Sequence, residues 1–528
     1  MSTNDSNRSV GLNRRNLLLS GVAGLASYAG LGSLALPTAL AAEPVKGGML
    51  RLAFSADPAG FDPARGPSGM SHVVIEQVYS TLMSLDPDAV PYPDLAERYE
   101  LTPDGLQYTF HLRKGVKFHN GDELTAEDVK FTFDRLKAPN SGYSYGSQVE
   151  TIKEVVADSP AQVTFKLSKP TGPFLVYMAF PGSSIVPKKL VEAGHDLNAN
   201  PVGSGPFKFV SYQPRSMVKF EKNPDFYETG KPYFDALEFH LIADVTALTN
   251  AVLSGTVNFS NEIPPKDWAQ VQSTPGLTGK TLEGSRYYWL LLNNTTPPLD
   301  NPKVRQAIAY AISREAIVAG TFFGQATAIT GGVIPQWNWA YADIKAFKPG
   351  GDLDKAKALL AEAGHADGFA TSLTMASSFP AMVAMAPIIQ ANLAAIGIKA
   401  KIKTMEIPRY WDEVWGPSAF DMTAMYWVSP LADPDDFVFN NYACKMAINV
   451  QKSCDAGMDA ALKEAKSGAT QEARKASYLK QQQLSLEQMP IVPLVNAWIL
   501  TAHTDKLKNY KPMRTGFLKT LKDAWLEA

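Results

Sequence analysis

The chain has 528 residues, of which 45% are hydrophobic and 19% charged, and its formal net charge is −2. This balance excludes a disordered or polytopic membrane chain, and the length predicts two or three domains. A charge so close to zero gives no reason to expect nucleic-acid binding, and two cysteines are too few for a metal cluster or a disulfide scaffold.

The N-terminal stretch is typical of an export signal. Arg14 and Arg15 precede residues 17–36, which carry no charge and are rich in Gly, Ala and Ser. This run is too weakly apolar to favour a spanning helix, and Ala39-Leu40-Ala41 offers the small-x-small pattern of a cleavage site. We therefore expect a cleaved signal over residues 1–41 and a periplasmic protein that begins near Ala42. The paired arginines resemble a twin-arginine signal. The Sec route and an uncleaved anchor remain alternatives.

The pattern of residues 105–136 predicts secondary structure but no catalytic or metal-binding function. Apolar and polar residues alternate from Tyr108 to Leu112, which predicts a half-buried strand, and "VKF" at 116–118 predicts the start of another. Thr125 and Asp128 form the acidic version of a capping box, so we expect a helix from there to Leu136.

One short motif suggests an enzyme. Residues 142–146, GYSYG, match the G-x-S-x-G nucleophile pattern around Ser144. That motif needs a strand before it and a helix after it, whereas the preceding "KAPNS" indicates a loop. The sequence contains no P-loop, H-E-x-x-H or C-x-x-C motif, so we expect no catalysis and no cofactor.

The second half of the chain predicts an α/β arrangement. Strands are expected at 371–377, 398–405 and 420–427, with helices at 382–396 and 408–415 between them. Strands that alternate with helices imply a parallel sheet covered on both faces. A further helix is expected from Pro302, capped by Asn301, whereas the chain before residue 290 is richer in strands and turns. Two lobes of different make-up would explain this contrast.

Four blocks in order, at 93–133, 201–244, 297–326 and 488–498, resemble the family 5 extracellular solute-binding proteins of ABC importers, which include peptide and nickel binders. The resemblance covers nearly all of the chain after the signal. It implies an α/β, two-lobed periplasmic-binding-protein fold of type II, in the large peptide-binder variant. It places the first lobe at 42–289 with an extra subdomain at about 86–200, the second lobe at 290–495, and a C-terminal return to the first lobe at 496–528.

The same resemblance implies a function. It predicts a monomeric periplasmic protein that captures a peptide or modified small solute in a cleft between the lobes and delivers it to an ABC permease. It implies no catalysis and no metal, and the nickel branch fits less well because no histidine cluster is seen.

Candidate ligand contacts are aromatic and polar residues in loops or at strand ends, where α/β sheets place ligands. Trp427 is the strongest candidate because it ends a buried strand; core packing is the alternative for each aromatic residue. The full set is Ser68, Gly69, Tyr143, Tyr145, Arg286, Tyr288, Trp427, Ser429 and Asp433.

Two departures from the family pattern concern the ligand. Peptide binders of the family commonly hold the peptide amine with an aspartate two to four residues after this tryptophan, where this chain has Ser429, Pro430 and Leu431. Dipeptide binders also show an arginine in the loop after the 371–376 strand, which here reads SSFPAM. A capped peptide, an opine-like compound or a glycosylated compound therefore fits as well as a dipeptide.

Cys444 and Cys454 lie ten residues apart in a polar stretch. In an oxidising periplasm we expect them to form a disulfide, with two separate buried thiols as the alternative.

Overall fold

The computed structural model describes residues 43–66, 68–468 and 470–527, so the predicted export signal lies outside the described residues. The chain from Pro44 onward forms one compact unit. Within the described ranges, no helix combines the length and the apolar character needed to cross a membrane.

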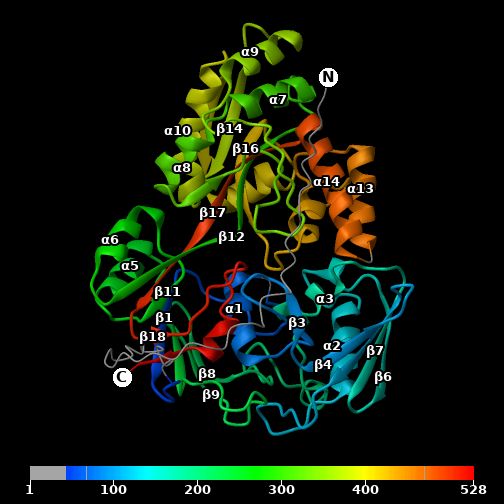
Figure 1. Ribbon diagram of the computed structural model, residues 1–528. Coiled ribbons are helices and arrows are strands. Elements are labelled where there is room, and N and C mark those ends of the chain that lie inside the picture. Colours follow the sequence, from blue (N-terminus) through cyan, green and yellow to red (C-terminus); the bar gives the residue numbers. More distant parts are fainter. Residues whose placement is uncertain (1–42, 67, 469, 528) are drawn as a thin grey trace, which may run out of the picture. The chain divides into compact units, whose positions relative to one another are not determined.

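One large mixed sheet runs through this unit (Figure 1). Its three strands at one end, β15, β14 and β16, are parallel, as the sequence predicts for this region, whereas β12 and β17 run antiparallel to their neighbours. In spatial order the strands are β15 (Lys399–Met405), β14 (Ala370–Ala376), β16 (Met422–Val428), β12 (Leu277–Leu292), β17 (Ile491–Thr504), β11 (Phe259–Ser260), β1 (Met49–Phe54), β10 (Ala236–Leu241), β9 (Met217–Lys222) and β8 (Phe207–Gln213), with β13 (Ala326–Ala328) beside β17.

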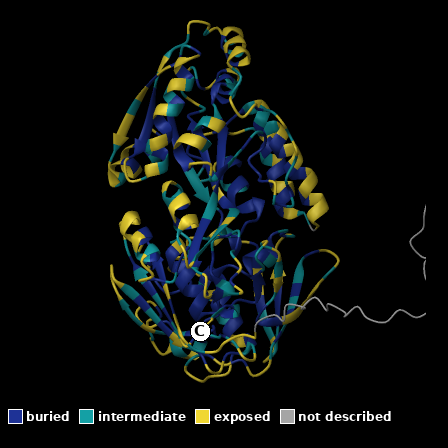
Figure 2. Cartoon of the chain, turned by 60° about the vertical axis from the view of Figure 1, so that its left-hand side comes forward, coloured by how far each residue is buried: buried dark blue, intermediate teal, exposed yellow. Residues whose placement is uncertain are grey.

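The two long strands β12 and β17 connect the two lobes. Their ends near Leu277 and Thr504 lie beside a cluster around Trp268, whereas Tyr287–Leu292 and Ile491–Ala497 belong to a separate hydrophobic core. The pairing of β12 with β17 shifts register between Glu283 and Arg286, a bulge between these two regions. Figure 2 shows buried residues concentrated along the strands, and exposed residues on the outer helices and loop tips.

A second, smaller sheet lies in the first lobe. It is antiparallel and has the order β4 (Ala96–Leu101), β5 (Gln107–Leu112), β7 (Gln162–Leu167), β6 (Ile152–Ser159). A short hairpin, β2 (Met83–Leu85) with β3 (Pro91–Pro93), precedes it, and β18 (Leu507–Lys508) pairs with β19 (Trp525–Leu526) near the end of the chain. The strand predicted from Tyr108 to Leu112 is confirmed as β5, with every second residue buried.

The helices begin where the sequence supplies caps. Asp128 accepts a hydrogen bond from the backbone N–H of Thr125, completing the capping box of α2, and Asn301 caps α7 with Pro302 as its first residue. The helices are α1 (Gly69–Val78), α2 (Ala126–Lys137), α3 (Phe174–Tyr177), α4 (Lys188–Glu192), α5 (Val245–Leu253), α6 (Trp268–Ser273), α7 (Pro302–Ala311), α8 (Arg314–Phe322), α9 (Leu353–Glu362), α10 (Pro380–Ala394), α11 (Ile407–Tyr410), α12 (Asn440–Tyr442), α13 (Ala456–Ser467) and α14 (Gln471–Gln488).

Two local predictions need correction. The "VKF" segment is not a strand, because Lys117 makes only an isolated bridge to Glu123 across the Asn120-Gly121 turn. The helix expected from residue 382 begins two residues earlier, at Pro380, because a proline fits the first turn, where its missing N–H has no partner to lose.

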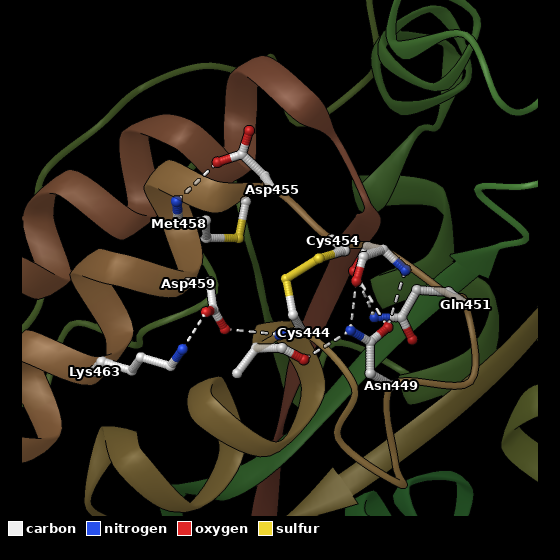
Figure 3. Close-up of a disulfide and its surroundings, with 10 residues drawn as sticks. Cys444, Asn449, Gln451, Cys454, Asp455, Met458, Asp459 and Lys463 are labelled. Atoms are coloured by element: carbon white, nitrogen blue, oxygen red, sulfur yellow. Dashed lines mark hydrogen bonds and ion pairs between the residues drawn. A yellow bond between two sulfur atoms is a disulfide. The ribbon is translucent and has the colours of Figure 1, made fainter.

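Cys444 and Cys454 lie at disulfide distance, with their sulfur atoms 2.07 Å apart (Figure 3). Hydrogen bonds hold the loop between them in place. The side-chain amide of Asn449 donates to the carbonyls of Ala443 and Ser453, and the backbone N–H of Cys444 donates to Asp459 at the start of α13. The loop is thereby tied to the helix that follows it.

Candidate functional site

The register between β12 and β16 decides how the predicted site residues are arranged. Trp427 lies opposite Tyr287, and Val428 lies opposite Arg286. Because successive side chains of a strand point to opposite faces of a sheet, Trp427 and Arg286 leave the sheet on opposite sides. The structure therefore does not bring these two predicted residues into one site.

On the Trp427 face, the indole lies beside a buried carboxylate. The Nε1–H of Trp427 donates to Oδ2 of Asp436 at 3.4 Å, and Tyr287 stacks on Phe437 with ring centroids 4.5 Å apart. Asp436 belongs to a π-helical turn, Asp435–Phe439, and is 5% exposed. Burial raises the pKa of Asp436 to about 7, and the neighbouring carboxylates Asp435 and Asp433 act in the same direction.

Asp433 is held by a cation. Two nitrogens of Arg474 donate to its two carboxylate oxygens at 3.0 and 2.5 Å, and both side chains are buried. A bidentate pair with a buried guanidinium uses one lone pair on each oxygen and neutralises the charge of the carboxylate. The structure thus places Asp433 in a buried ion pair with Arg474, and its predicted ligand contact stays a prediction.

Asp435 links the two lobes. The hydroxyl of Tyr177, at the end of α3 in the first lobe, donates to Oδ2 of Asp435 at 2.5 Å. The other oxygen, Oδ1, is buried and has no hydrogen-bond partner among the described residues. A backbone hydrogen bond from Gly172 to the carbonyl of Lys466 in α13 lies in the same contact region.

Tyr145 reaches the same region from the first lobe. Its half-buried ring packs against Phe180, with centroids 4.6 Å apart, and against His72 at 5.5 Å. Burial raises the pKa of Tyr145, and the charge of Asp436 raises it further, so the two side chains lie within electrostatic reach. Tyr145 of the first lobe thus lies within electrostatic range of the carboxylate to which Trp427 of the second lobe donates.

The opposite face of the sheet carries Arg286 and Tyr288. Arg286 is an exposed residue, and its guanidinium carbon stands 5.8 Å from the ring centroid of Tyr426. Tyr288 is buried between Tyr426, at 5.6 Å, and Phe322, at 5.0 Å. Among the residues that the structure describes, no carboxylate forms an ion pair with Arg286.

Comparisons with known proteins identify the family. The family-level profile of bacterial extracellular solute-binding proteins, family 5, matches residues 90–448. Di/tripeptide-binding protein 2 of Pseudomonas aeruginosa is 30% identical over 91% of this chain and 94% of its own length, and the glutathione-binding protein GsiB of Salmonella choleraesuis is 30% identical over 92% and 97%. The chain belongs to the family 5 bacterial extracellular solute-binding proteins.

Solved structures agree with this assignment. The Helicobacter pylori DppA protein in complex with the peptide STSA aligns with a TM-score of 0.79 and 29% identity, over 92% of this chain and 99% of that one. AgaA of A. tumefaciens R10, in complex with agropinic acid, aligns with a TM-score of 0.78 and 29% identity over 91% and 99%. The two-lobed α/β fold expected from the sequence is confirmed.

A family 5 protein is a substrate-binding component of an ABC importer and not an enzyme. The position of Ser144 agrees with this, because it lies in a turn without the strand and helix that a nucleophile elbow requires.

The other predicted contacts of this solute-binding protein have local structural partners. Ser68 caps α1 by accepting a hydrogen bond from the backbone N–H of Ser71, and Gly69 is the exposed first residue of that helix. Tyr143 donates to Oε1 of Gln148 at 3.1 Å. Ser429 is fully buried, and its carbonyl accepts a hydrogen bond from the Ser285 hydroxyl. These hydrogen bonds within the protein account for the positions of Ser68, Tyr143 and Ser429.

Sequence reasoning missed Asp436 and His72. Asp436 stands in an acidic run, DPDD, in which nothing distinguishes one carboxylate from another. His72 is 2% exposed in α1, burial lowers its pKa to about 4, and its Nε2 has no partner among the described residues. One feature of the sequence could have pointed to Asp436. It follows Trp427 closely, and no basic residue lies between them to neutralise its charge.

Proposed function

We propose that this solute-binding protein captures a peptide or a modified small solute between its lobes, against Tyr145 and Trp427, and delivers it to an ABC permease in the inner membrane. The observation that carries the proposal is that Trp427 of the second lobe donates a hydrogen bond to Asp436, whose charge also raises the pKa of Tyr145 in the first lobe. Aromatic platforms with a few fixed polar groups are typical of small-molecule sites.

The residues after Trp427 argue for a solute other than a plain dipeptide. Ser429, Pro430 and Leu431 carry no charge, so none of them supplies the carboxylate with which peptide binders of the family hold a peptide amine. The loop at 377–381 contains no arginine for a peptide carboxylate. The relatives named above bind di- and tripeptides, glutathione or agropinic acid, which supports a short peptide or a small modified compound.

We also propose the lobe boundaries expected from the sequence: 42–289 with a subdomain at about 86–200, 290–495, and a return at 496–528. The hydrophobic clusters support this division: one gathers residues from Leu50 to Phe259 together with Leu507–Ala524, and the other gathers residues from Tyr287 to Ala497. Among the described residues, Leu431 is the one second-lobe residue that packs in the first cluster. The protein acts as a monomer in the periplasm and binds no nucleic acid, and its signal at 1–41 is of the twin-arginine type.

The test of the site is a pair of tryptophan substitutions in the second lobe. A panel of di- and tripeptides, glutathione and agropinic acid is first screened by thermal melt, and the best binder is titrated by calorimetry. Trp427→Ala should weaken binding about thirtyfold, because one buried aromatic contact contributes ~2 kcal/mol. Trp411→Ala, at an exposed tryptophan of the same lobe (38% exposed), should leave the affinity unchanged.

In the same titration, Arg286→Ala tests whether the solute binds on the Trp427 face or on the Arg286 face of the sheet. Because Arg286 projects away from Trp427, its loss should leave the affinity unchanged. An unchanged affinity in Trp427→Ala, or a strong loss in Arg286→Ala, would move the site to the other face. A collapsed melt in Trp427→Ala would assign that residue to the core.

A further inference from the structure

A cavity of about 280 Å³ lies at the end of the second lobe that is remote from Trp427. It lies beyond the end of β12, where Leu292 pairs with Met422 of β16. Trp427 is further along β16, and a strand rises ~3.4 Å per residue, so its Cα lies about 17 Å from that of Met422. The cavity is therefore separate from the proposed solute site.

The wall of this cavity combines segments that are far apart in the sequence. They are the start of α7, the short helix α12, the loop that the disulfide closes, and the N-terminus of α13 beside that loop (Figure 3). The cross-link fixes one wall, so the cavity does not depend on a bound molecule for its shape. The lining residues that bear on its chemistry are Asp300, Arg305, Tyr442, Lys452 and Asp455.

Tyr442 contributes a buried hydroxyl without a partner. The residue is 2% exposed, and its hydroxyl makes no hydrogen bond to any residue that the structure describes. Burial raises the pKa of this phenol, so the group stays neutral and can both donate and accept. Because buried hydroxyls normally have a hydrogen-bond partner, a polar molecule in the cavity would complete this one.

Two opposite charges line the same cavity without meeting. Lys452 and Asp300 are exposed residues, and neither forms an ion pair with another residue of the described ranges. Their charged atoms therefore stand more than 4.0 Å apart. A molecule that carries both an ammonium and a carboxylate can span this gap, with its carboxylate at Lys452 and its ammonium at Asp300.

The other two charges in the wall are already bound within the protein. Arg305 is buried, and its guanidinium donates to four backbone carbonyls. Asp455 caps α13, where its Oδ1 accepts a hydrogen bond from the backbone N–H of Met458 at 2.7 Å. These two charges are opposite in sign, so the free pair, Lys452 and Asp300, decides which class of molecule fits.

We propose that this cavity is a second binding site, for a zwitterion of the size of a free α-amino acid. Asp300 binds its ammonium, Lys452 binds its carboxylate, and the Tyr442 hydroxyl completes a hydrogen bond to it. The volume lies just below the ~300 Å³ at which sites for drug-sized molecules begin, which suits a molecule of this size. The inference goes beyond the proposed function, because the site fills independently of the cleft between the lobes.

The probes are the free proteinogenic L-α-amino acids, titrated by calorimetry into the intact protein at pH 7. The amino acid that binds best is then compared with its N-acetyl derivative, which lacks the ammonium, and with its amide, which lacks the carboxylate. Each derivative should bind about tenfold more weakly, because one charged hydrogen bond is lost. A derivative that binds as tightly as the free amino acid would overturn the inference, and so would the failure of every amino acid to bind.

Single substitutions locate the site. Lys452→Gln and Asp300→Asn should each weaken binding about tenfold, and Tyr442→Phe, which removes only the hydroxyl, about fivefold. Lys445→Gln is the matched control, because Lys445 is an exposed lysine of the same loop with the same left-handed backbone (φ 62° against 56° for Lys452) and does not line the cavity. It should bind like the wild type. Both charge variants change exposed residues, so their melting temperatures should stay unchanged.

Trp427→Ala distinguishes this inference from the proposed function. It should keep the amino-acid affinity of the wild type, whatever it does to the transported solute. Amino-acid binding that is lost in Trp427→Ala and kept in Lys452→Gln would place the amino acid between the lobes and overturn the second site. An unchanged solute affinity in Trp427→Ala would count against the proposed function alone.

Discussion

Replacing Asp436 by Asn should make the ligand-free protein more stable at pH 8 and leave its stability almost unchanged at pH 4. An aspartate in an unfolded chain has a pKa of ~3.9, whereas burial raises the folded value for Asp436 to about 7. An acid whose pKa is higher in the folded state keeps its proton longer there. Its contribution is therefore neutral below about pH 4, becomes destabilising as the pH rises towards 7, and is constant above that.

The size of the effect follows from the difference in pKa. About three units at ~1.36 kcal/mol per unit give a cost of about 4 kcal/mol above pH 7, which the neutral amide removes. The side chain is buried, so solvent screens this cost little, and the Asn oxygen can still accept the hydrogen bond from Trp427.

Urea denaturation at pH 4, 6 and 8, followed by far-UV circular dichroism, measures the difference between variant and wild type. Asp412→Asn is the matched control, because the same substitution at an exposed site should change stability by no more than ~0.5 kcal/mol. A difference for Asp436→Asn that does not grow between pH 4 and pH 8 would refute the reasoning. It would mean that the carboxylate is solvated or paired with a cation.

Two further predictions concern the covalent state of the mature chain. Cys444 and Cys454 should be oxidised, so thiol titration of the unfolded, unreduced protein should find no free thiol; reduction should cost up to ~3 kcal/mol of stability, from a closed loop of about ten residues. N-terminal sequencing of the periplasmic protein should begin at or near Ala42, and replacing Arg14-Arg15 by Lys-Lys should block export. Export that survives this change would favour the Sec route, and a membrane-bound form that keeps both arginines would indicate an anchor.

Local elements were predictable because neighbouring residues determine them. The capping box of Thr125 and Asp128 and the Asn301-Pro302 cap start helices through contacts that span three residues or fewer. The parallel order of β14, β15 and β16 followed from the alternation of strands and helices. The "VKF" segment failed as a strand because an apolar pattern says nothing of whether a partner strand lies alongside.

The sequence by itself determined the family, the two-lobed fold, the class of function and the choice of Trp427 as a candidate, because these depend on motifs and their order along the chain. Only the tertiary structure decided which candidates lie together. The register that sets Trp427 opposite Tyr287 sends Arg286 to the other face, and a shift of one residue would have reversed this. The three aspartates of the acidic turn look alike in sequence, yet Arg474 neutralises one, Tyr177 binds the second, and Asp436 is left without a cation. These partners come from distant parts of the chain, so their positions depend on how the whole fold packs.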